Sequence, residues 1–220
     1  GFPVPSLEDD IIDYYAGDVL LCLDLSHQLV ISRQADFERL RNHGVQIWFT
    51  VYDLLPIVLP KAFPDGVEHL HCSWLGVIAK VGDAVCISKA VADELAEWYK
   101  MSRTGHRRPF KIDWFHLGAD INASMPSKGM PDNANAVLNT ISAHPSFLMV
   151  GTLEPRKGHS QTLDAFEILW MQGIEANLVI VGKQGWKMDS LIDRLNHHPR
   201  LSKNLFWLDS ISDEYLGKIY

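Results

Sequence analysis

The sequence predicts an α/β protein made of two parallel-sheet units. Short apolar runs of strand length alternate with amphipathic stretches of helical length along most of the chain, an alternation that is typical of strand–helix–strand layering. Hydrophobic residues make up 47% of the 220 residues and charged residues 21%, so the chain has enough apolar mass to bury a sizeable core. A polar stretch at 122–143, rich in proline, glycine, serine and asparagine, interrupts this rhythm and favours two units over one.

Seven strands are expected from short runs rich in Val, Ile, Leu and Phe. Four precede the polar stretch and three follow it, and we expect the strand that ends at Val150 to be buried. Both units look incomplete, because the first opens without an initial strand and glycine-rich turn, and the second has fewer strands than the roughly four to six of most open sheets. The chain is therefore expected to be a fragment. The expected strands are 19–23, 45–51, 84–87, 112–116, 147–150, 178–181 and 205–208.

The helices between the strands are predicted from apolar residues that repeat at spacings of three and four. Ser88 can cap the N-terminus of the helix that follows the third strand. A helix at 160–172 is expected to end before Gly173, because glycine readily adopts the left-handed conformation found at helix C-termini. Ser212 is expected to begin the last helix. The three clearest apolar faces consist of Val91, Leu95 and Trp98; of Leu163, Phe166 and Trp170; and of Met188, Leu191, Ile192 and Leu195.

Charge and cysteine content narrow the class of protein. The net charge of -7 argues against general nucleic-acid binding, because the overall field repels phosphate backbones. The sequence has no run of about 18 apolar residues that could span a membrane, and GFPVPSLEDD at the N-terminus is not a signal peptide. The cysteines Cys22, Cys72 and Cys86 lie far apart in apolar contexts, so we expect reduced core residues. These features indicate a cytoplasmic protein that is at most bound to a membrane surface.

The loop GTLEPRKGH, which follows the strand 147–150, is the strongest candidate for an anion-binding site. In an open parallel sheet, ligands bind beyond the carboxyl ends of the strands, where a helix N-terminus offers free amides and a positive dipole. The planar guanidinium of Arg156 can donate hydrogen bonds to two phosphate oxygens, and Lys157 adds a compact positive charge. The pair therefore suits a diphosphate. Gly158 lets the backbone come close to the ligand. The alternative is that both cations are merely exposed on a surface loop.

Two further loops are expected at the same edge of the second sheet. Gly182 and Gly185, in VIVGKQGWK, follow the next strand. After the last strand, the backbone of Asp209, Ser210 and Ile211 could contact a nucleobase. Taken alone, each of these loops is more simply explained as ordinary turn chemistry. The Walker pattern and GxGxxG are both absent, and the missing GxGxxG argues against a nicotinamide-dependent oxidoreductase, the first rival function.

Together these motifs resemble glycosyltransferase family 4, a family of retaining enzymes with the GT-B fold. The second unit carries VGTLEPRKGHSQTLDAF, NLVIVGKQGWK and LFWLDSISDEYLGKIY, which are similar to the family's C-terminal domain. The first unit carries WFTVYDLLPI, VCISKAVADEL and FHLGADI, which are similar to the closing half of its N-terminal domain. The resemblance covers nearly the whole chain and extends to bacterial mannosyl and rhamnosyl transferases of surface polysaccharide assembly.

The resemblance implies two Rossmann-like domains that face a cleft, both incomplete in this chain. It assigns 1–125 to the C-terminal part of the acceptor-side domain, 126–143 to a linker, and 144–220 to the N-terminal part of the nucleotide-sugar-binding domain. It implies a nucleotide-diphosphate sugar donor, with GDP-mannose favoured, and a saccharide or lipid-linked acceptor. It implies no cofactor and no metal. It also implies a cytoplasmic location, which is compatible with peripheral contact at the inner face of a membrane.

The family's donor-binding residues carry over onto the second unit. Arg156 and Lys157 match the pair that holds the donor diphosphate and stabilises the departing nucleotide, because charge grows on the leaving phosphate as the glycosidic bond breaks. Retention in the family proceeds by attack on the face that the leaving group vacates, with the phosphate taking the acceptor's proton, so no carboxylate nucleophile is required. The other expected donor contacts are Gly151, Thr152, Gly158, Gly182, Lys183, Asp209, Ser210 and Ile211.

Two features depart from the family's pattern. Tyr52 stands where the family often has a histidine that touches the donor sugar, and the neighbouring Asp53 is the better candidate for a sugar or acceptor contact. The family's two glutamates, separated by seven residues, would lie beyond Tyr220, and the equal spacing of Glu167 and Glu175 is judged accidental. This chain alone is therefore expected to be inactive. A catalytically silent nucleotide-binding or scaffold module of the same fold is the alternative function.

Two other clusters are expected to be structural or solvated. His69, His71 and Cys72 could suggest a metal site, but residues two apart on a helix point in different directions. The basic stretch at 103–111 could attract an anionic acceptor or a membrane surface, although a solvated loop is the simpler interpretation.

Overall fold

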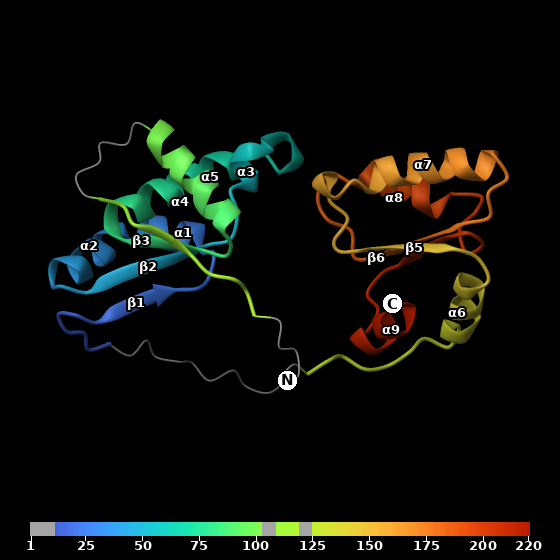
Figure 1. Ribbon diagram of the computed structural model, residues 1–220, viewed down its shortest axis with the longest axis horizontal. Helices are drawn as coiled ribbons and strands as arrows, with labels where there is room; N and C mark the ends of the chain where they lie inside the picture. Colours follow the sequence, from blue (N-terminus) through green and yellow to red (C-terminus); the bar gives the residue numbers. More distant parts are fainter. Residues whose placement is uncertain (1–11, 103–108, 119–124) are drawn as a thin grey trace. The chain divides into compact units, whose positions relative to one another are not determined.

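The computed structural model describes residues 12–102, 109–118 and 125–220 of the chain. The chain divides into two compact units, coloured by sequence in Figure 1. The first unit consists of Gly1–Val58 and Gly66–Gly118, and the second of Leu59–Asp65 and Ala119–Tyr220. Each unit contains a parallel β-sheet with helices packed against it. The predicted α/β class with parallel sheets is therefore confirmed.

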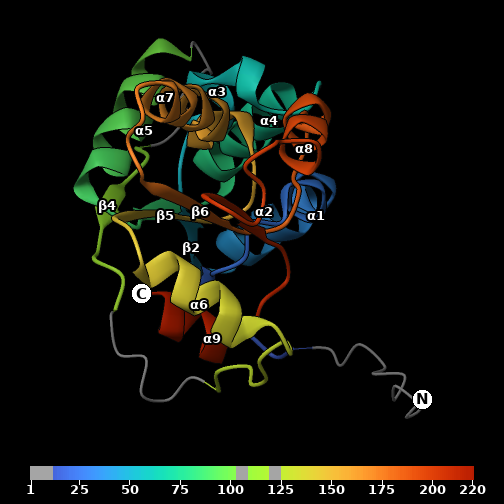
Figure 2. The same ribbon diagram turned by 90° about the vertical axis from the view of Figure 1, so that its right-hand side faces the viewer.

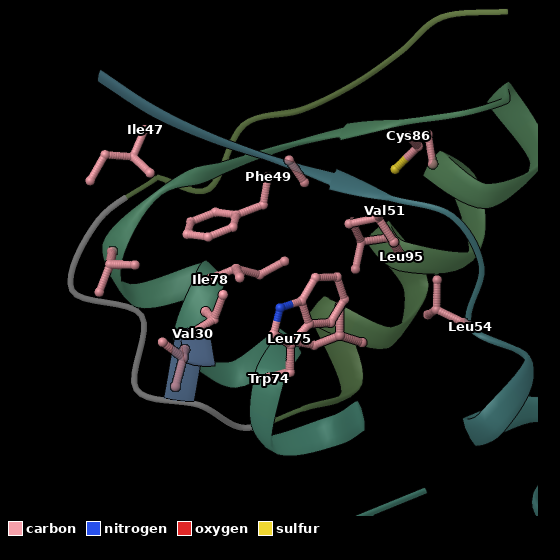
Figure 3. Packing of buried hydrophobic residues seen from close by; sticks show 14 of the residues in the cluster. Val30, Ile47, Phe49, Val51, Leu54, Trp74, Leu75, Ile78, Cys86 and Leu95 are labelled. Carbon is pink, nitrogen blue, oxygen red and sulfur yellow. The ribbon is translucent and has the colours of Figure 1, made fainter. Parts of the chain in front are cut away.

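Within the described residues, the sheet of the first unit has four parallel strands, in the order β1 (Val19–Cys22), β2 (Gln46–Val51), β3 (Asp83–Cys86) and β4 (Ile112–Trp114). Its helices are α1 (His27–Ser32), α2 (Gln34–Asn42), α3 (Leu55–Val58), α4 (Val67–Val81) and α5 (Lys89–Met101). The core lies between the sheet and these helices. Phe49 and Val51 of β2 meet Trp74 and Leu75 of α4 and Leu95 of α5 there (Figure 3).

Among the residues that the structure describes, the sheet of the second unit has three parallel strands, in the order β5 (Ser146–Val150), β6 (Asn177–Val181) and β7 (Leu205–Leu208). Its helices are α6 (Ala134–Ser142), α7 (His159–Met171), α8 (Asp189–Asn196) and α9 (Asp213–Ile219), with 3-10 turns η1 (Pro60–Ala62) and η2 (Pro155–Lys157). Helices α7 and α8 cover one face of the sheet, and α6 and α9 cover the other (Figure 2). Strand β6 is buried on both faces: Leu178 and Ile180 pack with α7 and α8, whereas Val179 and Val181 pack with α6 and α9.

The helix termini follow the capping chemistry expected from the sequence. The Ser88 Oγ accepts a hydrogen bond from the Val91 amide at 3.3 Å, and the Ser212 Oγ accepts one from the Tyr215 amide at 3.0 Å. Gly173, with a φ of +79°, is left-handed and follows the C-cap of α7.

All seven expected strands lie within two residues of their predicted bounds. None of the helices in the described ranges combines the length and the hydropathy that a membrane span requires.

The prediction that the strand ending at Val150 is buried is wrong. Strand β5 lies at one edge of its sheet, and Phe147 and Val150 are 56% and 44% exposed. Its apolar run resembles that of β6, but β6 has a strand on each side.

The expectation for the cysteines holds in part: all three are free thiols, but only Cys86 among them is buried, whereas Cys22 and Cys72 are half-buried.

The segment 126–143, expected to be a linker, forms part of the second unit. Helix α6 lies within it, and Ile141 of this helix packs in a core cluster with Val179. Before the helix, the Ser127 amide and hydroxyl donate to the carboxylate of Asp213 at 2.8 and 2.7 Å. The sequence does not indicate this helix clearly, because its few large apolar residues stand among Ala, Asn, Ser and Thr, which are common in loops.

Candidate functional site

The loops that follow the strands of the second unit lie side by side at the carboxyl edge of its sheet. The Gly151 amide donates to the Val181 carbonyl at 2.9 Å, and the Gly182 amide donates to the Leu208 carbonyl at 3.1 Å. The first residue of each of these two loops is thus bonded to the end of the neighbouring strand. This confirms the expected juxtaposition of the loops that begin at Gly151, Gly182 and Asp209.

Two of these loops approach so closely that they need glycine. The Leu153 amide donates to the Lys183 carbonyl, and the Gly185 amide donates to the Leu153 carbonyl, both at 2.9 Å. A Cβ atom on Gly182 would lie 2.1 Å from the carbonyl oxygen of Gly151, and one on Gly185 would lie 2.5 Å from that of Leu153. These glycines therefore serve the contact between the two loops. The sequence alone indicates only turns at these positions.

Arg156 and Lys157 lie in the 3-10 turn η2, between the end of β5 and the start of α7. Gly158 follows with a φ of +75°, a left-handed conformation that glycine adopts without strain, and its carbonyl accepts a bond from the Thr162 amide at 3.0 Å. Thr152, earlier in the same loop, is exposed. Both cations therefore stand beside the N-terminal turn of α7, where the helix dipole and the free amides favour an anion.

Glu154 belongs to this loop, although the sequence patterns do not single it out. The residue is 6% exposed, and its Oε2 lies 2.8 Å from Nε of Arg156. The contact is an ion pair without the alignment of a hydrogen bond, since Oε2 has no hydrogen-bond partner among the described residues. Because the carboxylate contacts the Nε side of the guanidinium, the opposite edge with the two terminal amino groups can face another anion. An acid two residues before an arginine at a strand end is the signal that points to it.

His159, the first residue of α7, is buried and adds no charge to the loop. The residue is 2% exposed, and its Nδ1 has no hydrogen-bond partner in the part of the chain that the structure describes. Burial lowers its pKa below the ordinary value of 6.5, and the charge of Lys157 lowers it further, while Glu154 acts in the opposite direction. The imidazole is therefore neutral at neutral pH, and Arg156 and Lys157 supply the positive charge of this loop.

The loop after β7 contributes a fixed backbone segment to the same edge. Ser210 has a φ of +56°, which is uncommon for a residue other than glycine, and its hydroxyl bonds to the carboxylate of Asp209. The Ile211 side chain packs against the core cluster that contains Ile141 and Val181. Ile211 therefore anchors the segment, while Asp209 and Ser210 stay accessible to solvent.

Tyr52 and Asp53, the expected sugar or acceptor contacts, follow β2 in the first unit. The Tyr52 hydroxyl donates to the Leu23 carbonyl at 2.7 Å, and Asp53 Oδ1 accepts a bond from the Leu55 amide at 3.1 Å. Each side chain therefore has a structural partner that fixes its position in the turn. Tyr52 is still 37% exposed. The contacts of both residues with a sugar or an acceptor stay predictions.

The other clusters that the sequence suggests have structural partners or lie elsewhere. His71 is buried in α4 and faces His27, and within the described ranges no group of three or more His, Cys, Asp or Glu residues could hold a metal ion. Glu167 of α7 pairs with Arg194 of α8 at 2.7 Å, so this acid belongs to a structural ion pair. Of the basic stretch, Arg103, His106, Arg107 and Arg108 lie outside the described residues.

Comparison with known sequences relates the chain to enzymes that transfer sugars. Residues 133–220 match the family model described as glycosyl transferases group 1. Over its whole length the chain is 44% identical to a serotype-specific mannosyltransferase WbdA of Escherichia coli, of which it spans 27%. A second Escherichia coli protein of the same description is also 44% identical, and the chain spans 26% of it. The chain thus spans about a quarter of the length of these curated relatives.

Comparison with solved structures concerns the fold. The chain is similar to the catalytic domain of starch synthase IV from Arabidopsis thaliana bound to ADP and acarbose, with a TM-score of 0.54. The likeness covers 93% of this chain and 50% of that one, at 13% sequence identity. At this identity the likeness shows the fold alone. It confirms the expected GT-B class for this chain.

Proposed function

We propose that this chain carries the donor-diphosphate site of a retaining glycosyltransferase, which moves a sugar from a nucleotide-diphosphate sugar to a saccharide or lipid-linked acceptor. The observation that carries the proposal is the placement of Arg156 and Lys157 after β5 and before the N-terminus of α7. Two adjacent cations at a helix N-terminus suit a diphosphate. The match of residues 133–220 to glycosyl transferases group 1 supports the proposal, because it contains this loop.

Sugar transfer requires positive charge at the leaving group. When the bond between the sugar and the terminal phosphate of the donor breaks, negative charge grows on that phosphate. Arg156 and Lys157 stabilise this charge more in the transition state than in the ground state, and the barrier falls accordingly. Glu154 contributes by contacting Nε of Arg156, so that the guanidinium is oriented before the donor binds.

The retaining course of the reaction is proposed from the family resemblance. The acceptor hydroxyl attacks the anomeric carbon on the face that the phosphate vacates, the sugar–phosphate bond breaks, and the departing phosphate takes the hydroxyl proton. Side-chain cations supply the charge in this scheme, so it requires neither a cofactor nor a bound metal. Tyr52 and Asp53 are proposed to contact the sugar or the acceptor.

The choice of donor rests on the relatives. Both Escherichia coli proteins are described as mannosyltransferases, so we propose a GDP-mannose-like donor. The remaining donor contacts are proposed at the loops beside Arg156. These contacts are Gly151, Thr152, Gly158, Gly182, Lys183, Asp209, Ser210 and Ile211.

Isothermal titration of the chain with GDP, UDP, ADP and dTDP tests the binding step. We expect GDP binding that weakens with added salt, because charge attraction dominates it, and that is lost when Arg156 and Lys157 are both replaced by Ala. Lys203→Ala is the matched control, since Lys203 is exposed and precedes β7, at the opposite edge of the sheet. Equal binding in the double variant and in the control would remove the phosphate assignment.

A transfer assay separates an enzyme from a silent module. It uses GDP-mannose and a mannose-terminated oligosaccharide, with this chain and with a longer protein that contains it, because the chain spans 27% of the first relative. Transfer of mannose by the longer protein is the expected result. GDP binding without any transfer would favour the alternative, a catalytically silent nucleotide-binding or scaffold module.

A further inference from the structure

Two histidine side chains connect the ends of β1 and β2 in the first unit. His27 is the first residue of α1, which follows β1, and His71 lies in α4. The Nε2 of His27 lies 2.8 Å from Nδ1 of His71, and His71 is 1% exposed. The Nε2 of His71 lies 3.1 Å from the carbonyl oxygen of Asp53, in the turn after β2. The pair therefore links one strand end to the other.

The protons of this pair can be placed from the partners. A carbonyl oxygen can only accept, so Nε2 of His71 carries a proton and donates it to Asp53. In a neutral imidazole the other nitrogen is an acceptor, so Nδ1 of His71 accepts from the Nε2–H of His27. Burial lowers the pKa of both histidines and so favours the neutral forms. Both hydrogen bonds are thus donated in the same direction, from His27 to His71 and from His71 to Asp53.

Trp74 packs against both imidazole rings. Its ring centroid lies 5.3 Å from that of His27 and 5.3 Å from that of His71, and the residue is 1% exposed. His71 and Trp74 are buried, whereas His27 is half-buried, so a charge is costly chiefly on the His71 ring. Burial of His71 therefore favours the neutral arrangement.

The turn after β2 is held at further points. The Tyr52 hydroxyl donates to the Leu23 carbonyl, just beyond β1, at 2.7 Å. The Asp53 carboxylate accepts from the Leu55 amide at 3.1 Å, at the start of α3. Together with the bond from His71 to the Asp53 carbonyl, three hydrogen bonds hold the turn: one through the Tyr52 hydroxyl, one through the Asp53 carboxylate and one through the Asp53 carbonyl. The bond to the carbonyl is donated from α4.

We propose that His71 is a positioning residue for the turn that carries Tyr52 and Asp53. By donating to the Asp53 carbonyl, His71 fixes the backbone from which both side chains project. His27 holds His71 in the tautomer that can donate. The inference rests on the proposed function, in which Tyr52 and Asp53 contact the sugar or the acceptor. In this scheme His71 itself touches no reacting atom.

Variants at position 71 test the positioning role. His71→Gln keeps a donor near the place of Nε2, whereas His71→Leu fills the site without either hydrogen bond. In the longer protein that contains this chain, we expect His71→Leu to lower kcat/KM for the acceptor by about tenfold, the effect of one or two lost hydrogen bonds, and to leave GDP binding by titration unchanged. His71→Gln should restore most of the loss. His69→Leu is the matched control, because His69 is exposed on the same helix.

Two measurements on this chain do not depend on transfer. Nitrogen NMR should find His71 as the Nε2–H tautomer, and the Leu55 amide should exchange faster in His71→Leu than in the wild type or in His71→Gln. The opposite tautomer, or unchanged exchange at Leu55, overturns the inference. Unchanged acceptor kinetics in folded His71→Leu overturns it as well. If the wild type gives no transfer, the proposed function fails, while the tautomer and the exchange rate still decide whether His71 holds the turn.

Discussion

The Nε of Arg156 and the Oε2 of Glu154 lie 2.8 Å apart, and this contact joins a buried acid to a cation of the candidate site. The Glu154 side chain is 8% exposed and that of Arg156 is 25% exposed. The carboxylate reduces the net positive charge of the loop, so it weakens the attraction for a diphosphate. It also fixes the direction of the guanidinium, which serves the transition state. The charge of Glu154 is therefore expected to weaken binding of the diphosphate and to raise turnover.

Glu154→Gln separates these two effects. The amide keeps the size of the side chain but removes its charge, so we expect GDP to bind about threefold more tightly, while kcat falls by about tenfold because Arg156 is less well oriented. Titration measures the binding, and steady-state kinetics of the longer protein that contains this chain measure kcat. Glu167→Gln is the matched control, since Glu167 pairs with Arg194 between two helices and should affect stability alone. Weaker GDP binding with unchanged kcat in Glu154→Gln would contradict the orienting role.

In the longer protein that contains this chain, Arg156→Ala and Lys157→Ala should each lower turnover by about two orders of magnitude or more, because both cations stabilise the leaving group. The fold should survive, since both residues lie in an exposed turn. Circular dichroism checks the fold and the transfer assay measures turnover. Arg156→Lys should recover only part of the rate, because lysine lacks the planar fork. Wild-type rates in either alanine variant would remove the catalytic assignment.

Gly182→Ala should destabilise the second unit by about 2 kcal/mol, the typical cost of forcing atoms into a packed site. The added Cβ would lie 2.1 Å from the carbonyl oxygen of Gly151, so one of the two loops must move. Gly217→Ala in α9 is the control, because a Cβ there has no atom within 4 Å and alanine favours a helix. Urea unfolding of both variants measures the difference. Equal stability of the two variants would show that the loops do not pack as described.

Stability should fall as the pH drops below about 6.5, the pKa of an unperturbed histidine. Burial lowers the pKa of His27, His71 and His159 in the folded protein, and His27 and Asp53 are the titratable neighbours that act on His71. The unfolded chain therefore takes up protons at a higher pH than the folded chain. The contribution is complete above the unfolded pKa and is lost as the pH falls towards the folded values. Urea unfolding at a series of pH values measures this, and His71→Gln should reduce the slope. Stability that rises on mild acidification would be inconsistent with neutral buried histidines.

Chelators should leave transfer by the longer protein unchanged, because the proposed scheme takes its positive charge from Arg156 and Lys157. The measurement is the transfer rate before and after treatment with EDTA, with the protein passed over a desalting column in both cases. Loss of activity that magnesium or manganese restores would show that a metal ion shares the role given to these side chains.

The strands and helix caps could be predicted because their causes are local. The apolar run of β6 and the bond from the Val91 amide to Ser88 each depend on residues only a few positions apart, so periodicity and residue type are sufficient. Arg156 and Lys157 could be found for the same reason, since a strand on one side and a helix on the other place them at a sheet edge.

Local patterns thus determined the α/β class, the order of the elements and the loop with two cations. Tertiary contacts decided which strand is buried, where α6 docks, and which polar groups are paired. Strands β5 and β6 have similar apolar runs, yet Phe147 and Val150 of β5, at the sheet edge, are exposed, whereas β6, with a strand on each side, is buried throughout. His27 and His71 stand 44 residues apart, and nothing near either residue indicates the other. Periodicity tells which face of an element is apolar, whereas burial and pairing depend on partners that are distant in the sequence.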